Sequence, residues 1–131
     1  MPSYRGLKAW EHARRLAVEC SKAARRLPRL EQPALAAELR QSGYAVVLRI
    51  AAASTGPSRD RRSALQEAQR ALAEIDTILC IAHDLEYLPS ADYARLEALS
   101  EATGRTLYGF LQKFDASRRG VVEPSSSAPS G

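Results

Sequence analysis

The stretch from Ala64 to Leu88 constrains the fold of this chain more than any other part of its sequence. Six apolar residues recur along it at alternating spacings of three and four residues: Leu65, Ala68, Leu72, Ile75, Leu79 and Ala82. Such spacing places them on one side of an α-helix. No glycine or proline interrupts the stretch, and a stripe of Leu, Ile and Ala needs other helices to cover it. The sequence therefore predicts a helix over Ala64–Leu88 within a helical protein.

Three further segments have helical periodicity: Leu7 to about Leu27, Pro33 to Ala53 and Ala91 to Phe114. The chain has 131 residues, enough for a single domain with one core, and no convincing run of β-branched and aromatic residues that would indicate a strand. Four helices joined by short turns predict an all-α, up-down-up-down antiparallel four-helix bundle over residues 1–115. Residues 116–131 are rich in Ser, Pro and Gly, so we expect a disordered tail there.

The second predicted helix has apolar residues on two sides. One side forms its core face, and the other holds Tyr44, Leu48, Ala51 and Ala52 where an isolated surface helix would be polar. A helix that is apolar on two sides is commonly buried on two sides. We therefore interpret Tyr44, Leu48 and Ala51 as a candidate subunit contact in a homo-oligomer.

Positive charge is concentrated in the first half of the chain. Residues 1–70 contain 14 Lys and Arg against 6 Asp and Glu, whereas residues 71–131 contain 5 against 9. On the first helix, a basic stripe lies opposite the apolar side and is formed by Lys8, Arg15, Lys22 and Arg26. Such a stripe is either a solvated helix face or a surface for a polyanion such as a nucleic acid.

A second basic cluster lies between the second and third predicted helices. We expect Ser54 to Arg62 to be the one long break between helices, with Ser58 or Asp60 capping the next helix. Arg59, Arg61 and Arg62 would then lie beside a helix N-terminus, whose amides favour an anion. The alternatives are a phosphate-binding cluster and an ordinary polar loop.

Other classes of function have little support in the sequence. Cys20 and Cys80 are interpreted as small buried residues in a reducing cytosol, and a metal site would need more ligands than these and two scattered histidines. The sequence has no Gly-rich phosphate loop and no Glu-x-x-His pair, so we expect no enzymatic activity, metal or cofactor. It also has no signal peptide core and no membrane-spanning segment, which predicts a cytoplasmic protein.

Two blocks of sequence resemble a known family. The segment YRGLKAWEHARRLAVECSKAARRLP and the segment LAEIDTILCIAHDLEYL, from Leu72 to Leu88, resemble the four helix bundle proteins encoded in intervening sequences of bacterial large-subunit ribosomal RNA genes. The resemblance covers about residues 4–114. One departure lies at the end of the second helix, where the family's Ser-Ile-Pro-Ser-Asn-Ile-Ala-Glu-Gly pattern is replaced by AVVLRIAAA, residues 45–53.

The resemblance implies a four-helix protomer that assembles into a ring-like homopentamer with a basic surface. In architecture it is similar to the accessory variability protein of diversity-generating retroelements, which binds a reverse transcriptase and nucleic acid. Two functions follow as hypotheses. One is a non-enzymatic oligomeric module that contacts RNA or DNA phosphates with little sequence preference. The alternative is a protein–protein scaffold, or an accessory subunit that docks a nucleic-acid enzyme such as a reverse transcriptase.

Overall fold

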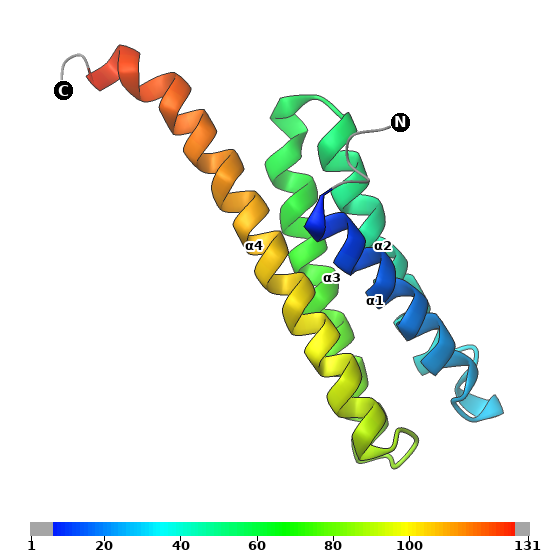
Figure 1. Cartoon of the computed structure of the whole chain (residues 1–131). Coiled ribbons are helices and arrows are strands. Elements are labelled where there is room, and N and C mark those ends of the chain that lie inside the picture. The colour runs from blue at the N-terminus through cyan, green and yellow to red at the C-terminus, as the bar shows by residue number, and fades with distance from the viewer. Residues whose placement is uncertain (1–6, 128–131) are drawn as a thin grey trace.

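The chain folds into four long antiparallel helices (Figure 1). The computed structural model describes the backbone of residues 7–127 and the side chains of residues 7–113. The elements are α1 (Lys8–Arg25), a short 3-10 helix η2 (Arg29–Glu31), α2 (Leu35–Thr55), α3 (Ser58–Asp84) and α4 (Ser90–Ser127). Helices adjacent in sequence pack together, and α1 closes the square by packing on α4. The predicted up-down-up-down bundle is therefore confirmed.

The core is formed by the predicted apolar stripes. All six residues of the apolar stripe on α3 are buried. They share the core with residues of α2 and α4 such as Leu39, Ile50, Leu96 and Leu107. Each fully buried Leu or Ile side chain stabilises the fold by roughly 1.5–3 kcal/mol. Most of the stability of these helices therefore comes from packing against one another.

Helices α1 and α2 approach closely because small residues line their contact. On the α1 side these are Ala13, Ala17, Cys20 and Ala24, all buried. Opposite them lies Gly43, where an added Cβ atom would be 3.4 Å from both Ala17 Cα and Cys20 Cβ. A side chain larger than alanine would push the two helices apart, so Gly43 permits the close approach of α1 and α2.

The connection between α2 and α3 is shorter than predicted. We expected a long break from Ser54 to Arg62, but α2 continues to Thr55 and α3 begins at Ser58. Pro57 is the N-cap residue of α3 and no side chain caps this end, so neither Ser58 nor Asp60 has the predicted capping role. Proline at this position has no amide hydrogen and a φ of −60°, which suits the start of a helix.

The fourth helix is longer than predicted. We expected it to end near Phe114, but its backbone continues to Ser127. Among the side chains that the structure describes on this helix, which end at residue 113, Leu111 is the last buried one. The expected disordered tail, 116–131, thus begins within the span of α4. Its last residues, 128–131, lie outside the described residues.

Hydrogen bonds from two polar side chains fix the end of the bundle that contains η2. Gln32 Nε2 donates hydrogen bonds to the carbonyl oxygens of Ala24 (2.9 Å) and Leu27 (3.0 Å), which satisfies acceptors at the C-terminus of α1. The Tyr87 hydroxyl donates to Glu31 Oε2 at 3.0 Å and so joins the α3–α4 turn to the α1–α2 connection. This bond to the carboxylate raises the pKa of Tyr87.

Candidate nucleic-acid interface

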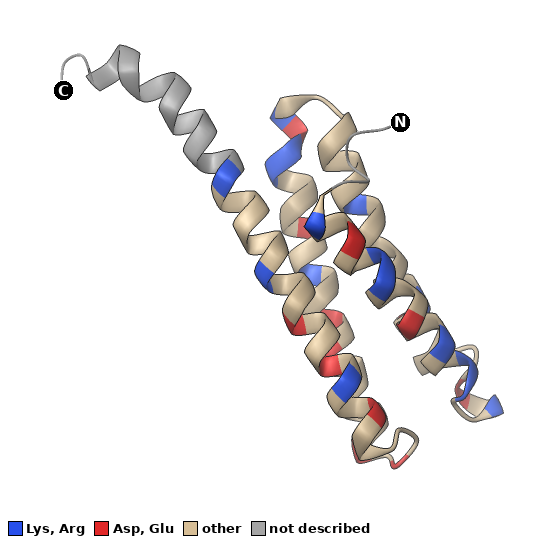
Figure 2. Ribbon diagram, viewed as in Figure 1, with Lys and Arg blue, Asp and Glu red and all other residues tan. Residues whose placement is uncertain are grey.

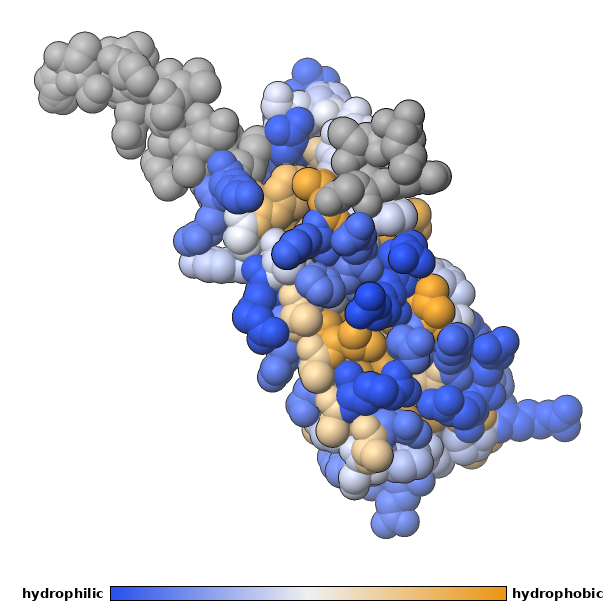
Figure 3. All heavy atoms as spheres, in the orientation of Figure 1, coloured by the Kyte–Doolittle hydropathy of each residue, from blue (hydrophilic) through white to orange (hydrophobic). Residues whose placement is uncertain are grey.

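The predicted basic stripe lies along the exposed edge of α1, beside α4. All four of its members are exposed: Lys8, Arg15, Lys22 and Arg26. In Figure 2, Lys and Arg residues alternate with acidic residues along α1, and charges of both signs are also present on the neighbouring α4. In the space-filling view of the same side, hydrophilic side chains cover both helices and leave apolar atoms visible between them (Figure 3). We call this surface the α1–α4 face.

Two cations of α4 belong to this face, and the sequence analysis missed both. Lys113 and Lys8 line one cleft of about 420 Å³, together with Leu7 and Phe110, at the end of the bundle where α1 begins. Arg95 lies near the other end of α1, where its guanidinium reaches across to Glu19. The signal was available in the sequence, since residues 95 and 113 are separated by five turns of a helix and so share one side.

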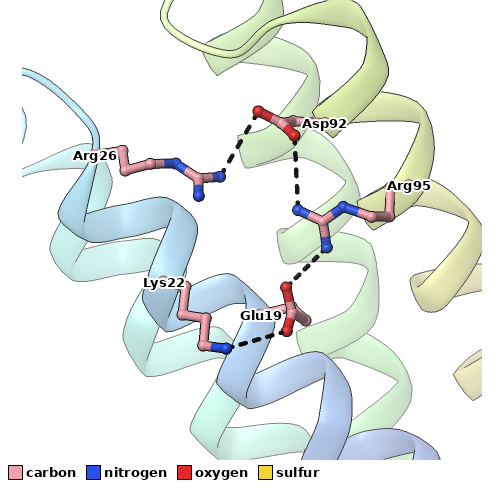
Figure 4. Close-up of polar contacts among 5 residues, drawn as sticks. All are labelled: Glu19, Lys22, Arg26, Asp92 and Arg95. Carbon is pink, nitrogen blue, oxygen red and sulfur yellow. Dashed lines mark hydrogen bonds and ion pairs between the residues drawn. The ribbon is translucent and has the colours of Figure 1, made fainter.

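Five charged side chains form a network across the half of the face near the C-terminus of α1 (Figure 4). Arg95 Nη1 lies 2.7 Å from Glu19 Oε1, and Arg95 Nη2 lies 3.7 Å from Asp92 Oδ1. Arg26 reaches Asp92 and Lys22 reaches Glu19, each at 3.7 Å. Three cations against two carboxylates leave this network with one positive charge in excess.

The ion pairs divide the predicted stripe into two halves. Lys22 and Arg26 have carboxylate partners, whereas no ion pair is described for Lys8 or Arg15. The ion pairs of Lys22, Arg26 and Arg95 are solvated, with side-chain exposures of 24–55%, so each contributes little to stability. The half of the face near the start of α1, which contains Lys8 and Arg15, presents its cations directly to solvent.

The second predicted cluster does not join the stripe. Arg59, Arg61 and Arg62 lie in the first turns of α3 and not in a loop, and α3 is diagonal to α1 in the bundle. Arg61 Nε donates to the Ala53 carbonyl oxygen at 2.9 Å, so this side chain satisfies the C-terminus of α2. The Arg59 side chain is exposed. Of the seven predicted phosphate contacts, the four on α1 form one surface, and the three on α3 lie apart from it.

The predicted subunit contact is an exposed apolar area on the outer corner of α2. In the single chain, Tyr44 is 45% exposed and Leu48 is 58% exposed, while Ala51 is half-buried. Val18 of α1, which is 44% exposed, lies beside Tyr44 in the groove between the two helices. An apolar area of this kind on a surface helix favours a protein contact.

The two cysteines differ in burial, and each histidine contacts a residue of α4. Cys20 is buried as predicted, and this burial raises the pKa of its thiol to about 12. Cys80 is exposed, so its predicted burial is wrong. His83 stacks on Tyr93 with ring centroids 4.5 Å apart, and His12 Nδ1 lies 3.3 Å from Thr106 Oγ1 between α1 and α4.

Within the described residues, no three His, Cys, Asp or Glu side chains are grouped so that they could hold a metal ion. None of the helices, over the same part of the chain, combines the length and the apolar character that crossing a bilayer requires.

Fold and surface together define a class of protein: a four-helix bundle with a cationic face along its first and last helices. The model of the 23S rRNA-intervening sequence protein family matches residues 5–109 of the chain. The protein therefore belongs to the 23S rRNA-intervening sequence protein family, which confirms the resemblance of its two sequence blocks. No curated protein matches the chain.

Proposed function

We propose that this protein is a non-enzymatic, oligomeric module of the cytoplasm that binds the phosphates of RNA or DNA through its α1–α4 face. The observation that carries the proposal is the excess of cations over carboxylates along this face. Six cations lie on it, and they are Lys8, Arg15, Lys22, Arg26, Arg95 and Lys113. The free thiols of Cys20 and Cys80 support a reducing compartment.

The chemistry of the face supports contacts to the nucleic-acid backbone and little reading of bases. Its cations are long side chains on a helix edge. Along α1 the successive cations of the face lie four or seven residues apart, and each residue adds a rise of about 1.5 Å. They can track a row of phosphates, which supply affinity but no sequence information. Among the described residues two tyrosines are exposed: Tyr44, at the corner of α2 away from α4, and Tyr108 of α4. Tyr108 is five residues from Lys113, so it lies on a different side of α4 from the cations of the face. Neither tyrosine is interleaved with these cations, which leaves little opportunity for base stacking.

The test is binding of nuclease-treated protein to fluorescein-labelled RNA and DNA oligonucleotides. The double substitution Lys8→Gln/Arg15→Gln removes two cations for which no ion pair is described, and we expect it to weaken binding at least tenfold. The matched control, Arg70→Gln/Arg105→Gln, removes the same charge from exposed positions on α3 and α4. Equal losses in the two variants, or no loss in the first, would contradict the proposal.

A second candidate function is a scaffold that docks a partner protein, such as a nucleic-acid enzyme. The exposed apolar side chains of Val18, Tyr44 and Leu48 favour it. A partner retained after nuclease treatment, and lost on Leu48→Ser but not on Lys8→Gln/Arg15→Gln, would support this function. The same outcome would argue against the nucleic-acid module.

A further inference from the structure

Two grooves of similar size lie on either side of α2 and carry opposite charge. The groove between α1 and α2 has a volume of about 420 Å³, and its charged lining residues are Arg14, Lys22 and Arg25. The groove between α2 and α3 has a volume of about 470 Å³, and its charged lining residues are Glu38 and Glu74. Within these linings, the first groove has no carboxylate and the second has no cation.

Both grooves also present exposed apolar side chains. Val18 and Tyr44 lie in the basic groove, with Leu48 on the next turn of α2. Ile81 lies in the acidic groove and is 42% exposed, and Leu85 follows it on the same side at 50% exposed. Each surface is therefore suited to a protein partner with an apolar centre and charges of the opposite sign around it.

The surface that complements the acidic groove is present on the same chain. We propose that the acidic groove between α2 and α3 of one copy receives the basic, apolar face between α1 and α2 of a second copy. This inference rests on the assembly that the proposed function includes, and it identifies the receiving surface. Tyr44 and Leu48 then become buried as the sequence predicts, and the unlike charges exclude the pairing of two identical faces.

The position of the two faces determines how such contacts repeat. In a square bundle the α1/α2 and α2/α3 faces are neighbours, so they meet at about 90° along α2. A head-to-tail contact between faces at this angle turns each copy by about 90° relative to the previous one, so it closes into a ring of about four copies. Helix α2 would line the centre of the ring, and the cationic α1–α4 face would remain on the outside.

A charge exchange within one chain tests the pairing. The molar mass of nuclease-treated protein is measured by light scattering over a dilution series. Arg25→Glu alone and Glu38→Arg alone should each raise the dissociation constant at least tenfold, because each places like charges across the contact. The double variant Arg25→Glu/Glu38→Arg should recover most of the assembly. Losses that simply add, or single variants that assemble like the original chain, would overturn the inference.

Controls separate this result from misfolding and from a general charge effect. Arg105→Glu and Glu101→Arg reverse charges at exposed positions of α4 and should leave the molar mass unchanged. Helical circular dichroism should be unchanged in every variant, since Arg25 and Glu38 are exposed.

Cross-linking distinguishes head-to-tail pairing from pairing of identical faces. In a Cys80→Ser background, Ser21→Cys/Ala73→Cys should form ladders of disulfide-linked copies on mild oxidation, because these residues line the basic and the acidic groove at the same height along α2. Neither single cysteine variant should do so. Linked dimers from Ser21→Cys alone would overturn the inference. If a correctly cross-linked assembly does not bind oligonucleotides, that result contradicts the proposed function and leaves this pairing intact.

Discussion

Cys20 and Cys80 differ in environment although both lie on helices of the same bundle. Cys20 is fully buried against Gly43, whereas Cys80 is exposed on α3. A thiol reagent should therefore modify Cys80 within minutes in the folded protein and Cys20 only on unfolding. Mass spectrometry of the labelled protein measures this, and rapid double labelling without denaturant would contradict the described packing.

The buried thiol also makes stability depend on pH. Burial raises the Cys20 pKa from its ordinary value of 9.0 to about 12. The unfolded chain releases this proton above about pH 9 while the folded chain retains it, so the stability is fully present below pH 9 and falls towards pH 12. The loss should be of the order of 1 kcal/mol per pH unit.

Urea unfolding of the original chain and of Cys20→Ala at pH 8 and pH 10.5 measures this effect. Tyrosines and lysines titrate in both proteins, so their contribution cancels in the comparison. The original chain should lose more stability than Cys20→Ala between the two pH values. Equal losses would show that the thiol is not desolvated as described.

At the scale of elements, the α3–α4 turn contains one residue in an unfavourable conformation. Glu86 has a φ of 64° and follows the C-cap residue of α3, Leu85. The amide of Tyr87 donates to the Ala82 carbonyl oxygen and that of Glu86 to His83, which is the Schellman arrangement. Glycine adopts such a φ without strain, and other residues do so at a cost of roughly 1–2 kcal/mol.

Glu86→Gly should therefore raise the free energy of unfolding by about 1 kcal/mol. Glu101→Gly, at an exposed position in the middle of α4, should lower it by a similar amount because the same change there has only the helix-propensity cost. Thermal and urea unfolding of the two variants give the comparison. A loss of stability in both would show that the Glu86 side chain contributes more than its backbone costs.

The sequence predicted the helices better than their connections, for a physical reason. The stripe on α3 has a period that only a helix provides, and its apolar residues must face the core. Pro57 can end one helix or begin the next, and only packing of the following turn determines which. Similarly, the residues of α4 beyond Phe114 have weak helix signals in the sequence. The backbone of α4 nevertheless continues as a helix through that segment.

At the scale of the whole molecule, the candidate interface could be predicted only in part. The cations of α1 share one helix edge, which periodicity shows directly. Arg95 and Lys113 come from α4, and the ion pairs of Glu19 and Asp92 depend on which helix lies beside α1. That pairing is a property of bundle topology and not of local sequence.

At the scale of the whole molecule, the protein has a cationic face on α1 and α4 and two apolar grooves of opposite charge on either side of α2. Lys22 belongs both to the cationic face and to the basic groove. The other proposed oligomer and phosphate contacts use different side chains: Arg14 and Arg25 belong to the first kind, and Lys8 and Arg15 to the second.

The salt dependence of oligonucleotide binding tests the central claim most directly. Each phosphate contact adds about 0.7–0.9 to the slope of log affinity against log salt concentration. The nuclease-treated protein should show a steep negative slope, and Lys8→Gln/Arg15→Gln should reduce its magnitude by about 1–2 while Arg70→Gln/Arg105→Gln leaves it unchanged. An affinity that does not change with salt, or a slope that all variants share, would contradict phosphate binding by the α1–α4 face.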